Sequence, residues 1–89
     1  MMPKFFFDIW DETGVLHDEH GAEFADLEEA TTHGIEALCR IAAEEMPKGR
    51  RVIAIEVRDD SDARVKFTLS LAREPVPTAA REQPMPHGG

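Results

Sequence analysis

Residues 51–72 have the sequence RVIAIEVRDDSDARVKFTLSLA, and this stretch decides the fold. Apolar side chains occupy every second position in both halves, which is typical of strands with one buried face. The polar residues between the halves, DDSD at 59–62, are typical of a hairpin loop. We therefore predict two antiparallel strands, over residues 51–59 and 63–72. Their core-facing side chains are predicted to be Ile53, Ile55, Val57, Val65, Phe67, Leu69 and Leu71.

A second hairpin is predicted at the N-terminus, where residues 4–11 alternate in the same way. The turn is predicted at the sequence DETG, because its last residue, Gly14, can adopt a positive φ. The second strand is predicted over residues 15–18. After a turn or bulge it is predicted to continue over residues 22–24. The core-facing side chains of the first strand are predicted to be Phe5, Phe7 and Ile9.

One amphipathic helix is predicted between the two hairpins. Asp26 can accept hydrogen bonds from the free N–H groups of the first turn, and the glutamate three residues later completes a capping box. Pro47 cannot continue a helix, so the helix should end just before it. Gly34 lies in the middle of the apolar face, at a cost of about 1 kcal/mol relative to alanine. We therefore predict that the helix approaches the sheet closely there, with Phe5 or Phe7 filling the space.

The order of elements is β-β-α-β-β, which predicts an α+β fold: a two-layer sandwich of an antiparallel sheet with one helix packed on one face. The pattern leaves the order of the strands in the sheet open. Residues 1–73 are predicted to form a single domain. Residues 74–89 contain four of the six prolines and no apolar periodicity, so we predict a disordered Pro-rich tail.

The charge of the chain narrows the class of partner. Its 89 residues include 18 acidic and 10 basic side chains, for a net charge of −8, and a field of that sign repels nucleic acid and anionic membranes. The single cysteine, Cys39, allows no intramolecular disulfide, which suits a reducing compartment. We expect it to be a small buried side chain at the edge of the helix's apolar face. With no apolar stretch of membrane-spanning length, the expected location is the cytoplasm.

The sheet face turned away from the helix is the predicted interface. A single helix covers one face only, and the other face should carry Phe6 and Trp10 one period-two step apart. An exposed aromatic patch on a small protein is typical of an interaction site, and tryptophan is enriched at binding hot spots. Two alternatives remain: the tail covers this face, or Trp10 rests on the stems of neighbouring charged side chains. The predicted interface residues are Phe6, Trp10, Ala54, Lys66 and Thr68.

Candidate chemistry is sparse, and we predict neither an enzyme nor a bound metal or cofactor. The weak metal candidates are His17, Asp18 and His20, whose imidazole and carboxylate groups can ligate zinc. In an extended strand, however, His17 and Asp18 would point to opposite faces. A structural zinc site also requires four ligands. Polar residues beside a turn explain the run equally well.

The order of several short motifs resembles that of a known group. The chain is similar to a family of short, uncharacterised alphaproteobacterial proteins with an aromatic strand, a D-E-x-G-x-E turn segment, a D-L-x-x-A helix start and a late I-x-V-x-D hairpin. The resemblance covers about residues 4–71. It implies a bacterial protein of the predicted domain limits, and it implies no activity. The matching segments here are residues 5–7 (FFF), 11–14 (DETG), 18–24 (DEHGAEF), 26–30 (DLEEA) and 55–59 (IEVRD).

A weaker likeness is to the HicB-type antitoxins, which also run from strands into a helix beginning L-E-E-A, as residues 27–30 do here. That resemblance implies an acidic protein that binds a small basic toxin. The chain departs from the antitoxins because two strands rather than three precede the helix, and the P-D-L-P-G segment is absent.

The function expected from the sequence is therefore that of a small non-enzymatic interaction module that self-associates, as a homodimer, through the open sheet face or a strand edge. The alternative is an acidic inhibitor or antitoxin-like protein that binds a small basic protein.

Overall fold

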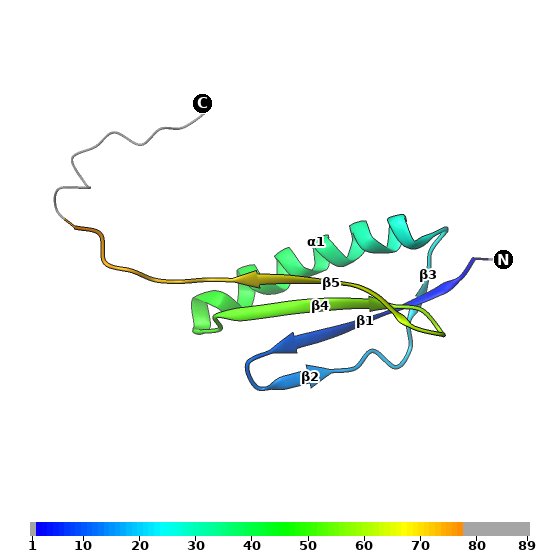
Figure 1. The fold of residues 1–89 in the computed structure, drawn as a ribbon, viewed down its shortest axis with the longest axis horizontal. Helices are drawn as coiled ribbons and strands as arrows, with labels where there is room; N and C mark the ends of the chain where they lie inside the picture. The colour runs from blue at the N-terminus through cyan, green and yellow to red at the C-terminus, as the bar shows by residue number, and fades with distance from the viewer. Residues whose placement is uncertain (1, 78–89) are drawn as a thin grey trace, which may run out of the picture.

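The computed structural model describes residues 2–77. Within them one α-helix lies on an open antiparallel sheet of five strands, so the predicted α+β fold is confirmed. Figure 1 shows the four longer strands side by side with the helix along the sheet. The elements in chain order are β1 (Lys4–Asp11), β2 (Gly14–Leu16), β3 (Ala22–Glu23), α1 (Leu27–Glu45), a 3₁₀ turn η1 (Met46–Lys48), β4 (Val52–Arg58) and β5 (Ala63–Ser70).

The sheet order, which the sequence pattern leaves open, is β2-β1-β4-β5. The two long hairpins therefore meet along β1 and β4, which pair antiparallel from Phe6 opposite Arg58 to Asp11 opposite Ile53. β3 also pairs with β1, at the N-terminal end of that strand. The central position of β4 explains its burial, because it has a strand on either side and α1 across one face.

The predicted second strand is divided in two, which corrects the predicted range of 15–18 continuing over 22–24. β2 ends at Leu16, and β3 comprises only Ala22 and Glu23. The residues between them leave the ladder because Gly21 has a φ of +69° and the carboxylate of Asp18 replaces a strand partner of β1. The strand predicted over 63–72 likewise ends earlier, at Ser70.

The helix begins and ends where its capping residues predict. Asp26 accepts a hydrogen bond from the Glu29 N–H at 2.9 Å, and α1 stops at Glu45, two residues before Pro47. The close approach at Gly34 is also confirmed. A Cβ added there would lie 3.2 Å from Val57 and 3.4 Å from the Phe7 ring, so Phe7 rather than Phe5 fills the space together with Val57.

The core lies between α1 and the inner face of β1 and β4. Cys39, expected to be buried, is exposed, because it lies on the side of α1 turned away from the sheet. Residues 71–77, including the start of the predicted tail, form no helix or strand and are exposed, and residues 78–89 lie outside the described residues. The buried apolar residues are Phe5, Ala30, Leu38, Ala42, Ile53, Ala54, Ile55 and Val57.

Candidate functional site

The face of the sheet turned away from α1, called the open face below, carries the residues that the alternation predicts. Its aromatic rings, however, are covered by other side chains. The guanidinium of Arg58 lies 4.5 Å from the centre of the Phe6 ring, and the ammonium of Lys66 lies 4.3 Å from that of the Trp10 ring. Both rings are half-buried as a result. The expected exposed aromatic patch is therefore corrected: long cationic side chains cover it, as amphipathic side chains do when their stems lie on apolar surface.

Four of the five predicted interface residues lie together on this face. Trp10, Ala54 and Thr68 are aligned across β1, β4 and β5, and Lys66 reaches over the Trp10 ring from the neighbouring row. The same four residues line a shallow cavity of about 320 Å³. Phe6 lies apart from them, because Asp8 stands between it and Trp10 along β1.

Asp8 is the buried charge at the centre of the open face, and it is a residue that the sequence pattern did not single out. It is only 1% exposed. Its carboxylate accepts hydrogen bonds from Arg58 Nε at 2.8 Å and from the Asp18 N–H at 2.9 Å, and His17 Nδ1 lies 3.4 Å away. Burial raises the pKa of Asp8, but the hydrogen bonds from Arg58 and Asp18 outweigh it and hold the pKa below its usual value.

Asp18 organises the loop between β2 and β3. Its carboxylate accepts hydrogen bonds from the N–H groups of Phe7, His20 and Gly21 at 3.0–3.1 Å. Its own carbonyl accepts from Arg58 Nη2 at 3.0 Å, so Arg58 ties this loop to Asp8. Burial raises the pKa of Asp18, and the three N–H donors together lower it further than burial raises it.

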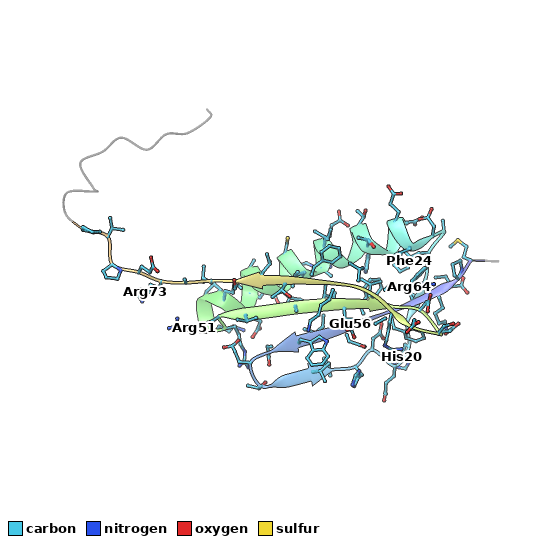
Figure 2. The ribbon with its side chains drawn as sticks, in the orientation of Figure 1. His20, Phe24, Arg51, Glu56, Arg64 and Arg73 are labelled. Atoms are coloured by element: carbon cyan, nitrogen blue, oxygen red, sulfur yellow. The ribbon has the colours of Figure 1, made fainter. Side chains whose placement is uncertain are left out.

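Two of the three weak metal candidates are thus engaged in other contacts. Asp18 accepts backbone hydrogen bonds through both oxygens, while His17 points at Asp8. Figure 2 shows His20 at the end of the sheet where the β4–β5 turn lies. Over residues 2–77, no three histidine, cysteine, aspartate or glutamate side chains converge in a way that could hold a metal ion.

Among residues 2–77, the outer edge of β5 is the longest strand edge that has no partner strand. β5 pairs with β4 along one side, and within the described range no strand pairs with its other side. Leu69 in β5 is 37% exposed, and Leu71, just beyond it, is 52% exposed. An unpaired strand edge beside exposed leucines can accept another strand and bury apolar surface at the same time.

A larger cavity of about 500 Å³ lies between α1 and the β1–β2 hairpin. Leu16 and Ile41 contribute apolar surface to it, and at its margin Arg50 Nε lies 3.6 Å from Asp11 Oδ2.

Of the helices in the described part of the chain, none has the length and apolarity needed to cross a lipid bilayer.

Comparison with curated proteins and with solved structures gives no match. A protein-family model described as "Domain of unknown function (DUF6894)" matches residues 4–72. These limits enclose every helix and strand above, from the start of β1 to just past the end of β5. The match spans well over half of the chain, and the protein therefore belongs to the DUF6894 family of uncharacterised domains.

Proposed function

We propose that this domain is a non-enzymatic interaction module that works in the cytoplasm and self-associates as a homodimer. The observation that carries the proposal is the unpaired edge of β5, with the exposed side chains of Leu69 and Leu71 beside it. Long apolar edge strands are normally shortened, charged or covered in monomeric proteins, because they otherwise pair with another chain. The exposed thiol of Cys39 suits a reducing compartment.

The small core supports the same proposal. Of the eight buried apolar residues in the described structure, three are alanines, so few large side chains are completely removed from water on folding. Domains of this length have a thin margin of stability, and association with a second copy commonly supplies the missing burial.

The β5 edge is favoured over the open face as the primary contact. On the open face, the rings of Phe6 and Trp10 already lie under Arg58 and Lys66, so a partner would have to displace both cations. The β5 edge needs no such rearrangement, because its backbone groups and leucines are already accessible.

Native mass spectrometry over a range of protein concentrations tests the proposal. The expected mass is that of a dimer for the wild type and for Trp10→Ala, and that of a monomer for Leu71→Glu, which places a charge beside the β5 edge. Circular dichroism of each variant controls for folding. A wild-type chain that stays monomeric up to its solubility limit would overturn self-association, whereas a monomeric, folded Trp10→Ala would move the contact to the open face.

A second candidate function, binding of a small basic protein, is favoured by the outer surface of α1. Glu28, Glu29, Glu36 and Glu44 are all exposed there, in a chain of net charge −8. A complementary basic surface would be attracted over several ångströms, and the attraction would weaken with salt. The test is co-purification of a small basic protein that is lost in high salt and in a Glu36→Lys, Glu44→Lys double variant. Retention in either condition would argue against charge-driven binding.

A further inference from the structure

We propose that two copies of this chain pair antiparallel through their β5 strands. The two-fold axis passes midway between Thr68 of one copy and Thr68 of the other, and is called below the axis at Thr68. The inference rests on the self-association proposed above and specifies which residues meet. It follows from the direction of the backbone groups of β5, the extent of its regular edge and the charges along it.

The backbone direction is set by pairing with β4. The Leu71 N–H donates to the Arg51 carbonyl at 2.8 Å, so the backbone groups of Leu71 point towards β4. In an antiparallel ladder, successive residues point alternately towards one neighbour and the other. The register between β4 and β5 is regular from Leu71 back to Val65. The backbone N–H and C=O groups of the odd-numbered residues of β5 therefore bond to β4, and those of the even-numbered residues point outwards. The outward-pointing residues are Lys66, Thr68 and Ser70.

The regular edge has a definite beginning and end. The register with β4 shifts between Val57, which faces Val65, and Arg58, which faces Ala63, so Arg64 is an extra residue in β5. Such a bulge bends a strand and interrupts its pairing. β5 ends at Ser70. The stretch available to a new strand partner is therefore residues 65–70, with Thr68 at the centre of its outward-pointing groups.

Only an axis at Thr68 pairs all of these groups within the regular edge. It places Thr68 opposite Thr68 and Lys66 opposite Ser70 of the second copy, so that the three N–H and three C=O groups of each strand all find partners. An axis at Phe67 would set Ser70 against the bulge at Arg64. An axis at Leu69 would set Lys66 beyond the end of the opposing strand.

Side-chain chemistry favours the same axis. An axis at Lys66 would place two ammonium groups directly opposite each other, which is destabilising in a sheet. The axis at Thr68 instead places two threonines face to face, a favourable cross-strand pair. On the helix side it sets Leu69 against Phe67, and Leu71 against Val65, of the second copy. The two exposed leucines would thereby be covered by half-buried apolar side chains.

Disulfide trapping tests the register. In a Cys39→Ser background, Thr68→Cys should form a covalent dimer on mild oxidation, because hydrogen-bonded antiparallel partners have Cα atoms about 5.5 Å apart, within disulfide reach. The single variants Lys66→Cys and Ser70→Cys should not cross-link, because each is four residues out of register with its own copy. An equal mixture of those two variants should cross-link as a heterodimer.

A proline substitution supplies an independent readout that involves no thiol. Thr68→Pro removes an N–H that points away from β4, so the monomer should stay folded and the dimer should be lost. Leu69→Pro is the matched control, because it removes an N–H that points towards β4 and should unfold the domain. A folded Thr68→Pro variant that remains dimeric would overturn the pairing.

The outcomes separate the two proposals. A wild-type monomer in native mass spectrometry overturns both self-association and the β5 pairing. A wild-type dimer that cross-links at Lys66→Cys or Ser70→Cys alone, or at none of the three sites, overturns the axis at Thr68 and leaves self-association standing.

Discussion

Replacement of Asp8 by asparagine should destabilise the domain far more than the loss of one negative charge from a protein of net charge −8 suggests. The carboxylate accepts from Arg58 Nε and from the Asp18 N–H, one donor on each oxygen. Asparagine keeps the shape but has a single acceptor oxygen, so its NH₂ group must face one of these two donors.

The size of the effect follows from the bond that is lost. A hydrogen bond to a charged group contributes about 1.5–3 kcal/mol. The side chain of Arg58 is 31% exposed, so water screens part of its interaction and the lower half of that range applies. We expect a loss of about 2 kcal/mol, out of roughly 4–10 kcal/mol for a domain of this length. That loss corresponds to a decrease in Tm of about 8–16 °C.

The assay is thermal unfolding followed by circular dichroism at pH 7 and at one fixed protein concentration, because a dimer's Tm depends on concentration. Glu56→Gln is the matched control. Glu56 lies directly opposite Asp8 on the same face, and its side chain makes no hydrogen bond within the described residues, so its removal should cost less than about 0.5 kcal/mol. Equal decreases in Tm for the two variants would refute the assigned role of Asp8.

Three further predictions follow from other contacts. Gly21→Ala should cost about 2 kcal/mol or more in urea unfolding, because φ is +69° and the new Cβ would lie 2.9 Å from the Phe5 carbonyl oxygen, whereas Gly14→Ala, with nothing within 4 Å, should cost less. Lys66→Ala should raise acrylamide quenching of the single tryptophan, Trp10, by uncovering its ring, and Lys48→Ala should leave quenching unchanged. The wild type should lose stability as the pH falls below about 4.5. The pKa values of Asp8, Asp18 and Glu12 lie below the ordinary values of 3.8 for aspartate and 4.5 for glutamate, so the unfolded chain takes up protons first. In acid titration by circular dichroism this loss should be shallower for Asp8→Asn, and an identical curve would contradict the assignment.

The sequence predicts those elements that are specified by local periodicity and capping. The alternation in residues 4–11 and 51–59 predicts β1 and β4, and Asp26 and Pro47 bound the helix, because these signals act over a few residues. The tight contact at Gly34 was also predictable, since a glycine on an apolar helix face requires compensation from a neighbour.

The missed features depend on contacts between distant residues. The second strand divides because Asp18 bonds to Phe7, eleven positions away, and to Arg58, forty positions away. The alternation of side chains along β1 places Phe6 and Trp10 on the open face. Whether cationic side chains cover these rings, however, depends on the strand register and on side-chain rotamers. The free edge of β5 can be identified only once the strand order is known. A carboxylate such as Asp8, alone among aromatic residues, was the one local sign of a buried polar network.

The two short strands β2 and β3, at the edge of the sheet opposite β5, determine how large an assembly can become. A protein with two open edges would polymerise head to tail, as fibre-forming sheets do. Here the edge of β1 opposite β4 is taken up by the three-residue β2, the two-residue β3 and the loop that Asp18 holds between them, and strands this short are poor templates for further growth. Pairing through β5 would therefore use up the one long free edge that residues 2–77 offer in each copy, and the assembly would stop at a closed pair whose size does not increase with concentration.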